Sequence, residues 1–343
     1  MKYKWWLTYF PKYYKILLIY FEKYVEPYND NIDMKEVYYQ FLHNLKGRPH
    51  CCKCNREVVF SSSGNEYRKF CDEHLYGFNK SFQEIELGDF IDSLNINVVK
   101  NIRNIINGEL DFYFPELNIA IEYNGCYWHS DKFKIKNYHY NKWKQCRDKN
   151  IQLFFIWEDD LLYKKDITYS LIKSKLGVYD NRIYARKTII KEVPYNIAKN
   201  FINKNHLQGY SLDKIRLGLY YNNELISIMT FRKSRFRSED MEIIRFCTML
   251  NYQVIGGASK LFSYFIKNYD CKSIISYAEC DISSGKLYEI LGMEYIDRSD
   301  NWKCMYKGIR YNRLNKIKDS EYKKDLLKCY SSGILKYKLN FQK

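Results

Sequence analysis

The segment ELDFYFPELNIAIEYNGCYWHSD, residues 109–131, constrains the fold more than any other part of this sequence. Its alternating apolar residues predict two short strands joined by a turn at Pro115–Asn118. Alternate residues of a strand point to opposite faces, so Glu122 lies on the face opposite Ile121 and Tyr123. The hairpin therefore places a carboxylate on a strand whose other residues belong in a core.

A second acid, Asp111, begins the first of these strands, and the turn can bring it beside Glu122. Two neighbouring carboxylates repel one another and lose on the order of several kcal/mol of hydration unless a divalent cation pairs them. Oxygen ligands of this kind suit Mg²⁺ or Mn²⁺, which can activate water and stabilise a phosphoryl transition state. His129 follows on a loop, where an imidazole could act as general base. The alternative is an exposed strand edge with solvated acids.

A small module between residues 49 and 78 is rich in cysteine and histidine. A segment of this size cannot bury enough apolar surface to fold alone, so metal binding would supply its stability. Cys52 and His50 are neighbouring alternatives for the first ligand, and with four protein ligands the zinc would be structural. Two pairs with the spacing typical of one tetrahedral zinc are present: Cys51 with Cys54, and Cys71 with His74.

The chain is strongly basic, with 56 Lys and Arg against 40 Asp and Glu in 343 residues and a formal net charge of +16. This balance suits a polyanion such as DNA, RNA or an acidic membrane surface. Lysines interrupt every apolar run near the start well short of the ~20 residues that a membrane span needs, so we expect no span and no signal peptide. Eleven cysteines without a secretory segment indicate a reducing compartment.

Periodicity predicts the elements around the hairpin and in the second half of the chain. A capping box at Ser81 and Glu84 opens a helix before the hairpin, and a helix over 136–150 and an apolar strand over 151–162 follow it. A second hairpin turns at Asn222–Asn223, and strand, glycine turn, helix and strand follow it. The expected parts are a basic aromatic helical region (1–48), the zinc module (49–78), the hairpin domain (79–178), an α/β domain (183–309) and a basic tail (310–343).

The hairpin domain resembles a known nuclease family. LDFYFPELNIAIEYNGCYWHS, the helix start YHYNK and IQLFFIWEDDL are similar to the core of very-short-patch mismatch repair endonucleases and related phage homing endonucleases, a branch of the PD-(D/E)xK superfamily. The resemblance covers about residues 81–178. It implies that Asp111 binds the metal, that Glu122 binds it directly or through water, that His129 is the general base, and that Glu84 reaches the site from its helix.

The resemblance leaves two points open. Asn124 stands where the wider superfamily has a lysine, which is expected if His129 takes the part of that lysine. The final catalytic acid of the family corresponds to either Asp148 or Asp131, while Glu158 ends a strand and could be structural.

The second half resembles the GNAT acetyltransferases. QVIGGAS at 253–259 is similar to their pyrophosphate-cradling turn, where glycines let backbone N–H groups face a phosphate at a helix N-terminus, and SSGKLYEILGMEYI at 283–296 is similar to their late helix and strand. Fold does not imply function, and such domains look like accessory modules when attached to phage homing nucleases. The resemblance implies a GNAT-like domain over 183–309 and cofactor contacts from Gln253, Gly256, Gly257 and Ala258.

Two further features of the second half carry weaker expectations. His206, in a loop, is expected to have no special role. A basic run could grip DNA phosphates or form the solvated end of a hairpin: Arg232, Lys233, Arg235 and Arg237.

Taken together, the sequence predicts a multidomain α/β (α+β) protein with a PD-(D/E)xK, Vsr-like nuclease core, a zinc module and a GNAT-like domain. The expected function is Mg²⁺- or Mn²⁺-dependent, site-directed hydrolysis of double-stranded DNA, in phage or mobile-element homing and in the host cytoplasm. The alternatives are a GNAT-type acyltransferase with a DNA-binding N-terminal half, a mismatch-nicking or defence nuclease, and a DNA-binding protein without enzymatic activity.

Overall fold

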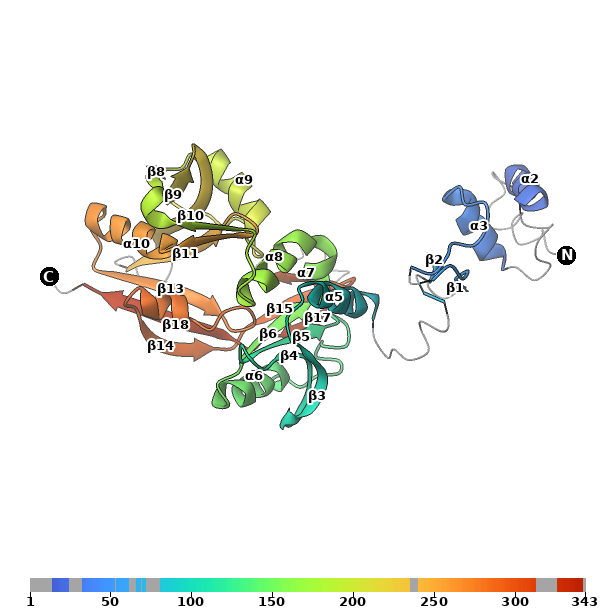
Figure 1. Cartoon of the computed structure of the whole chain (residues 1–343), viewed down its shortest axis with the longest axis horizontal. Helices are drawn as coiled ribbons and strands as arrows, with labels where there is room; N and C mark the ends of the chain where they lie inside the picture. The colour runs from blue at the N-terminus through green and yellow to red at the C-terminus, as the bar shows by residue number, and fades with distance from the viewer. Residues whose placement is uncertain are drawn as a thin grey trace. The chain divides into compact units, whose positions relative to one another are not determined.

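The computed structural model describes residues 14–24, 33–52, 54–61, 66–68, 70–71, 81–234, 240–312 and 326–341. The chain forms two compact units, Met1–Ile85 and Glu86–Lys343 (Figure 1). Within the described ranges, no helix combines the length and the apolar character required to cross a bilayer.

The N-terminal unit contains two helices and a short hairpin. Asp33 caps the second helix by accepting a hydrogen bond from the Lys35 N–H at 2.9 Å. Helices in residues 14–24 and 34–42 agree with the helical character expected of this region. The elements are α2 (Tyr14–Tyr24), α3 (Met34–Leu42), β1 (Phe60–Ser61) and β2 (Glu66–Tyr67).

A four-stranded mixed sheet opens the second unit, in the order β3-β4-β5-β6. The first three strands pair antiparallel and the last two pair parallel, so the third strand is interior to the sheet. The helix that precedes the sheet crosses the boundary between the two units. The elements are α5 (Phe82–Ser93), β3 (Val99–Ile106), β4 (Gly108–Phe114), β5 (Ile119–Asn124), α6 (Tyr138–Asp148), β6 (Gln152–Trp157), α7 (Glu158–Tyr163) and α8 (Lys165–Lys175).

The predicted hairpin is confirmed, with the turn at Pro115–Asn118 closed by Asn118 in the left-handed region (φ 51°). The capping interaction before α5 is also present, because Ser81 Oγ accepts a hydrogen bond from the Glu84 N–H at 3.2 Å. The strand expected over 151–162 ends earlier, at Trp157. Three acids follow it and open α7 instead, since negative side chains are favoured at the positive N-terminal end of a helix.

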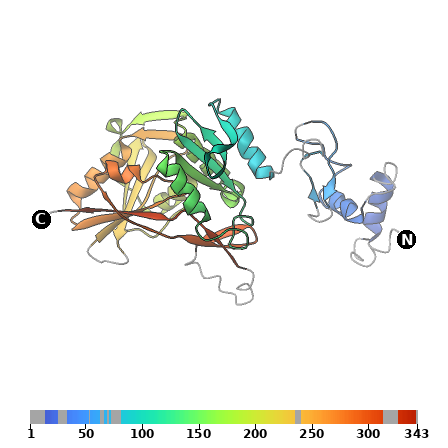
Figure 2. The same cartoon turned by 90° about the horizontal axis from the view of Figure 1, so that it is seen from below.

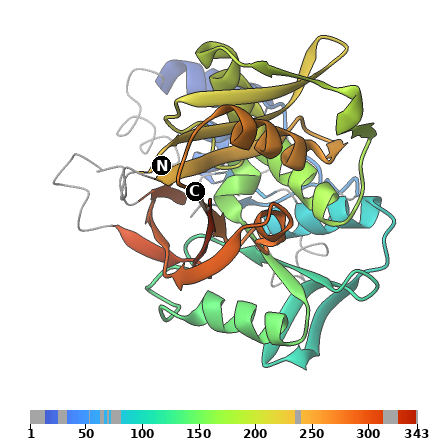
Figure 3. The same ribbon diagram turned by 90° about the vertical axis from the view of Figure 1, so that its left-hand side faces the viewer.

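A seven-stranded mixed sheet forms most of the C-terminal half, in the order β14-β18-β13-β11-β10-β9-β8. Helices α9 and α10 cover opposite faces, because Ile228 belongs to the cluster under α9 and its neighbour Met229 to the cluster under α10 (Figure 3). The elements are β8 (Ile189–Glu192), α9 (Tyr195–Asn205), β9 (Ile215–Tyr221), β10 (Glu224–Lys233), β11 (Asp240–Thr248), α10 (Gly257–Asn268), β13 (Ser273–Glu279), α11 (Lys286–Ile290), β14 (Glu294–Ser299) and β18 (Ile334–Asn340).

The predicted hairpin of the second half and the strand, glycine turn, helix and strand after it are confirmed. Asn222 and Asn223 both have positive φ, at 48° and 65°, as a two-residue hairpin turn requires. Parallel pairing of β11 with β13 covers only Asp240–Glu242 and Ser273–Ile275. The result is a mixed α/β domain with the order of elements expected from the sequence.

Two small sheets join the larger ones. β7 (Asn181–Tyr184), which precedes the 3-10 turn η1 (Ala185–Lys187), pairs parallel with β12 (Tyr252–Ile255). A three-stranded sheet in the order β16-β15-β17 is inserted between β14 and β18. Its strands are β15 (Trp302–Tyr306), β16 (Ile309–Asn312) and β17 (Leu327–Tyr330).

The expectation of a basic tail over 310–343 was wrong for its described part. β18 lies inside the seven-stranded sheet, between β14 and β13. Leu335 and Tyr337 are buried, and the lysines of the same strand, Lys336 and Lys338, alternate with them. A period of two therefore outweighs the basic composition. Residues 313–325, where much of the expected basic tail falls, lie outside the described residues.

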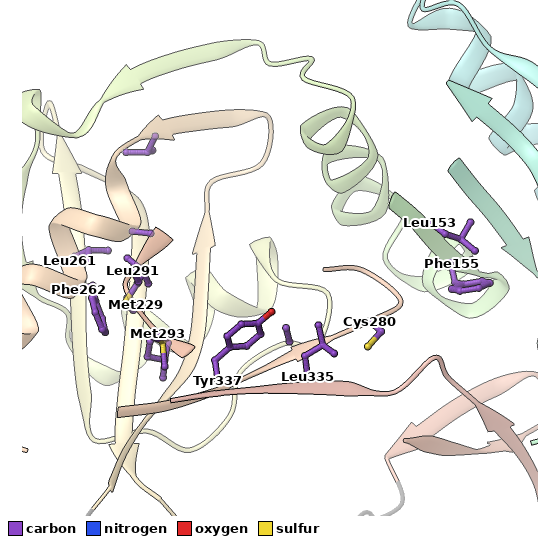
Figure 4. Close-up of a cluster of buried hydrophobic side chains, with 14 of the residues drawn as sticks. Leu153, Phe155, Met229, Leu261, Phe262, Cys280, Leu291, Met293, Leu335 and Tyr337 are labelled. Atoms are coloured by element: carbon purple, nitrogen blue, oxygen red, sulfur yellow. The ribbon is translucent and has the colours of Figure 1, made fainter. Parts of the chain in front are cut away.

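One cluster of buried side chains runs from the four-stranded sheet into the seven-stranded sheet. Leu153 and Phe155 of β6 belong to it together with Cys280, Leu335 and Tyr337 (Figure 4). Figure 2 shows the inserted strands, in red, beside the green elements of the four-stranded sheet. The second unit is therefore continuous in its core and is not a pair of domains joined only by a linker.

Candidate functional site

The paired strands β4 and β5 bring Asp111 and Glu122 together. Phe112 is paired with Ile121, which makes Asp111 and Glu122 the next opposed residues of the antiparallel ladder. Asp111 Oδ2 accepts a hydrogen bond from the Tyr123 N–H at 2.8 Å. Glu122 is 5% exposed on an interior strand, so the alternative of a solvated strand edge is wrong for this residue.

The environment of Glu122 is unusual for a carboxylate. Burial raises its pKa to about 8, and the charge of Asp111 contributes in the same direction. Glu122 Oε1 contacts the ammonium group of Lys142 on α6, whereas Oε2 has no hydrogen-bond partner. Asn124, on the same face of β5, is fully buried, and neither its Oδ1 nor its Nδ2 has a hydrogen-bond partner.

These orphaned oxygens fit a hard divalent cation. Mg²⁺ takes oxygen ligands, is usually held by one or two carboxylates and keeps several waters. Asp111 and Glu122 supply two carboxylates, and the Asn124 side-chain oxygen lies on the same strand face. Mn²⁺ accepts the same ligand types. The residues present therefore fit the cation that the sequence predicts.

Lys142 is a site residue that the sequence analysis missed. It supplies an ammonium group next to Glu122 from outside the strand that carries Glu122 and Asn124. A motif counted along one strand cannot find it, because the residue comes from the following helix. The available signal was the helical stretch after the hairpin, on whose buried face Lys142 lies with His139 and Trp143.

His129 lies on the loop between β5 and α6, as expected. Burial lowers its pKa to about 3, with further lowering by the charges of Lys134 and Lys142, so its imidazole is neutral at neutral pH. His129 Nδ1 lies 2.9 Å from His139 Nε2. A neutral imidazole with one nitrogen held in this way can accept a proton at the other.

The remaining predicted acids have different surroundings. Glu158 Oε2 accepts a hydrogen bond from the Cys126 N–H at 2.9 Å, and Asp131 Oδ1 accepts one from the Lys328 N–H at 2.8 Å. Each of these two carboxylates therefore accepts a hydrogen bond from a backbone N–H and helps to fix the local fold. Asp148 is the last residue of α6 and is exposed. Glu84 lies in the first turn of α5, in the N-terminal unit.

Exposed aromatic side chains surround His129 along the loop. Trp128 is 63% exposed, and its ring contacts Phe133 at 4.8 Å and Tyr127 at 5.3 Å between centroids. Lys132 Nζ lies 5.0 Å from the centre of the Tyr127 ring. Exposed aromatics beside a cation form a surface on which nucleobases can stack.

The N-terminal unit brings three cysteines together. Among the described residues, Cys51, Cys54 and Cys71 are the one group of three potential metal ligands whose ligand atoms lie within 4.8 Å of one another. Cys54 Sγ is 3.7 Å from Cys71 Sγ, close to the roughly 3.8 Å that two thiolates have on one tetrahedral zinc with Zn–S bonds of about 2.3 Å. The cysteines therefore fit a zinc ion, and the fourth predicted ligand, His74, lies outside the described residues.

The two alternative first ligands are placed differently. Cys52 and His50 are exposed, and neither belongs to the group of three. Backbone geometry explains the choice, because the Cys51 N–H donates to the Arg56 carbonyl at 2.7 Å and closes a tight turn. This turn directs the Cys51 and Cys54 thiols to the same place.

The glycine turn before α10 has a structural explanation of its own. Gly256 caps the helix with a φ of 76°, and a Cβ at Gly257 would lie 3.0 Å from Val254 Cγ1. Gln253 Oε1 accepts a hydrogen bond from Arg182 Nε at 2.8 Å. The predicted cofactor residues Gln253, Gly256, Gly257 and Ala258 thus surround the start of α10, as expected.

The segment 181–188 packs against the glycine turn before α10. The Lys260 ammonium group, in the first turn of α10, donates to the carbonyls of Ala185 and Thr188. β7 pairs with β12 immediately before them. A phosphate at this helix end would therefore meet the segment 181–188 as well as the glycines.

Part of the predicted DNA-binding run already has partners within the protein. The Arg232 guanidinium pairs with Glu242 at 3.3 Å and donates to the Leu212 carbonyl at 3.2 Å, while Lys233 is exposed at the end of β10. Arg235 and Arg237 lie outside the described residues. His206 Nδ1 accepts a hydrogen bond from the Gln208 N–H at 3.1 Å, and burial lowers its pKa to about 3, in keeping with a structural residue.

No protein-family model matches the sequence, and a comparison with curated proteins finds no match. Among solved structures, an IAA acetyltransferase from Bacillus cereus shares 14% identity over 45% of this chain and 99% of its own, with a TM-score of 0.30. The ribosomal-protein-S18-alanine N-acetyltransferase from Escherichia coli shares 11% over 46% and 95%, with a TM-score of 0.33. A GNAT family acetyltransferase from Elizabethkingia anophelis, with acetyl-CoA bound, shares 15% over 45% and 99%, with a TM-score of 0.30. At these values the likenesses assign no activity to this chain.

Proposed function

We propose that the second unit is a metal-dependent, site-directed DNA endonuclease that hydrolyses phosphodiester bonds. The observation that supports this best is the buried Glu122, which is opposed to Asp111, contacts Lys142 through one oxygen and has no hydrogen-bond partner at the other. The resemblance of the surrounding segment to a PD-(D/E)xK, Vsr-like core and to phage homing endonucleases supports the same class and a homing role.

The site residues have distinct chemical roles in this proposal. Asp111 and Glu122 would hold Mg²⁺ or Mn²⁺, which when bound lowers the pKa of water and offsets charge that develops on the phosphate. The contact with the Lys142 ammonium group favours the anionic form of Glu122 and so opposes the effect of burial on its pKa. His129, neutral at physiological pH, would accept the proton of the attacking water as general base.

The surroundings of the site suit double-stranded DNA. The exposed aromatic rings of Tyr127, Trp128 and Phe133 lie next to His129 in the chain. Nucleobases that are unstacked from the DNA can stack on these rings. The net charge of +16 attracts a polyanion over a long range. A structural zinc on Cys51, Cys54 and Cys71, with His74 as the fourth ligand, would fold the N-terminal module that accompanies the nuclease.

Cleavage of long phage or bacterial genomic DNA tests the proposal. Wild-type protein should give discrete fragments or nicks with Mg²⁺ and none with EDTA. Asp111→Ala and Glu122→Gln should each lower the rate by about 10²-fold or more, since each removes a metal ligand. Glu116→Gln, in the turn of the same hairpin, is the matched control and should cleave normally. Intact DNA with folded wild-type protein on its native target would overturn the proposal.

An acyltransferase activity of the GNAT-like domain is the second candidate. It is favoured by the Gly256 turn, which is exposed to solvent and begins a helix whose N-terminal amides favour an anion. A cavity of about 270 Å³ also lies beside the end of β11, lined by Phe246, Thr248 and Asn251 among others. Titration of the protein with acetyl-CoA in a calorimeter separates the candidates. Saturable heat at micromolar ligand would favour the acyltransferase, and no heat would remove it.

A further inference from the structure

We propose that the inserted sheet β15–β17 and the segment after it are a brace that fixes the loop carrying His129, so that the C-terminal half completes the nuclease site. This inference rests on the proposed function for its catalytic meaning, although the brace itself is a structural property. The two partners are almost 200 residues apart in the sequence, Asp131 in the loop and Lys328 in β17.

Reciprocal hydrogen bonds join the loop to β17. The Asp131 N–H donates to the Lys328 carbonyl at 2.7 Å, and the Lys328 N–H donates to Asp131 Oδ1 at 2.8 Å. Next to them, Cys329 Sγ donates to the Cys126 carbonyl at 3.4 Å. The loop is therefore held at both of its ends, on either side of His129.

A buried ion cluster anchors the same sheet to α7, the helix that directly follows β6. Arg310 of β16 donates through Nε to Asp159 at 2.8 Å and through Nη2 to Asp160 at 2.6 Å, with 5% of its side chain exposed. Its guanidinium carbon lies 4.3 Å from the centre of the Trp157 ring. Because an uncompensated charge at such a site costs about 3–5 kcal/mol, the sheet cannot easily leave this position.

His139 links His129 to the brace. His139 holds His129 Nδ1 at 2.9 Å, and its ring centroid lies 5.2 Å from that of Trp157, under which Arg310 packs. Ser332, which follows β17, donates its hydroxyl to the His139 carbonyl at 3.3 Å. His139 and Asp131 are thus positioning residues, and we assign neither of them a contact with substrate.

Loosening the brace should change the proton affinity of His129 as well as its position. The titratable and charged groups that face His129 are Tyr138, His139 and Lys142 from α6 and Lys134 from the loop. With the loop released, water reaches the imidazole and its pKa returns toward about 6.5. A base that is neutral at every working pH in the wild type would then be partly protonated at pH 6.

Three variants of the full-length protein test the brace. Asp131→Ala removes the acceptor for the Lys328 N–H, Asp131→Asn keeps an oxygen acceptor, and Asp270→Ala is an exposed control after α10. Hydrogen exchange of the loop amides at 126–131 reports the brace without reference to activity. We expect about tenfold faster exchange in Asp131→Ala, the size of one lost hydrogen bond to a charged acceptor, and wild-type exchange in the other two variants.

Cleavage rates at pH 8 and pH 6 report what the brace does. On going from pH 8 to pH 6, the rate of Asp131→Ala should fall by more than the wild-type rate, by up to about fourfold for a fully released loop, and Asp131→Asn should follow the wild type. Unchanged loop exchange in Asp131→Ala would overturn the inference. Loss of activity in Asp131→Asn with unchanged exchange would also overturn it, because a metal ligand behaves in that way. If the wild type does not cleave DNA, the proposed function fails, and the exchange result still decides whether the brace exists.

Discussion

At the scale of single residues, the buried pair of Lys142 and Glu122 dominates the candidate site. A buried ion pair contributes little net stability, yet loss of one partner leaves the other without compensation. The raised pKa of Glu122 adds a second feature, since at about 8 this carboxyl takes up a proton near neutral pH even beside Lys142. The pair therefore makes the site sensitive to both charge and pH.

We expect Lys142→Met to destabilise the metal-free protein by about 3 kcal/mol at pH 8 and by clearly less at pH 6. At the lower pH, Glu122 takes up a proton and no longer needs a counter-charge. Urea denaturation at both pH values measures the difference, with Lys144→Met, an exposed neighbour on α6, as control. An equal loss at both pH values would contradict the assignment of a buried ionised pair.

His206 makes a separate prediction about pH. Its pKa is lowered to about 3 in the folded chain, below the 6.5 of an ordinary histidine, so the unfolded chain binds more protons between these values. Stability is fully present above about pH 6.5 and falls as the pH drops toward 3, by up to about 1.4 kcal/mol per pH unit for one proton. His206→Gln should flatten this dependence in chemical denaturation from pH 7 to pH 5. A wild-type slope in the variant would show that other groups cause the loss.

At the scale of elements, neighbouring residues in the sequence determine the hairpin turns and helix ends. Tertiary packing adds constraints that the local sequence does not predict. The turn at Asn222 and Asn223 follows from side chains that tolerate positive φ. Gly218, in the middle of β9, has no such local reason. Its missing side chain admits Leu225 and Val193, whose atoms would lie 2.5 Å from an added Cβ.

Gly218→Ala should therefore destabilise the protein by about 1–3 kcal/mol through overpacking. The measurement is the midpoint of urea denaturation compared with the wild type. A double variant with Val193→Ala removes one of the two clashing side chains and should recover part of the loss. If the single variant is neutral, the sheet and α9 are less tightly packed than the structure indicates.

At the scale of the whole molecule, the two units depend on different sources of stability. The second unit has a continuous apolar core across both sheets, whereas the core of the N-terminal unit is small and built around the cysteines. We propose that zinc on these cysteines supplies the stability that so small a core lacks. Removal of metal should therefore affect one unit and spare the other.

We expect a zinc chelator to expose residues 44–85 to limited proteolysis while residues 86–343 stay resistant. Cys54→Ser should do the same without chelator and should lower the zinc content measured after purification. Cys52→Ser, one position from a predicted ligand and exposed, is the matched control and should retain zinc. Full protection of the N-terminal unit in the presence of chelator would argue against a structural zinc.

Local patterns in the sequence were sufficient for the elements that depend on neighbouring residues. The capping box at Ser81, the turn at Pro115–Asn118 and the two asparagines at 222–223 each act within about four residues, and all three are present. The alternation of β5 also placed Glu122 on the face opposite Ile121 and Tyr123, because a strand has a fixed period of two.

Tertiary structure alone decided what depends on distant parts of the chain. Lys142 reaches Glu122 from another element, β18 enters the middle of a sheet despite its basic composition, and Asp131 meets Lys328. The physical reason is that burial, counter-charge and strand neighbours are set by long-range packing, which no local period encodes. The sequence thus determined that Asp111 and Glu122 lie on neighbouring strands. The fold determined that Lys142 contacts Glu122 and that β17 holds the loop of His129.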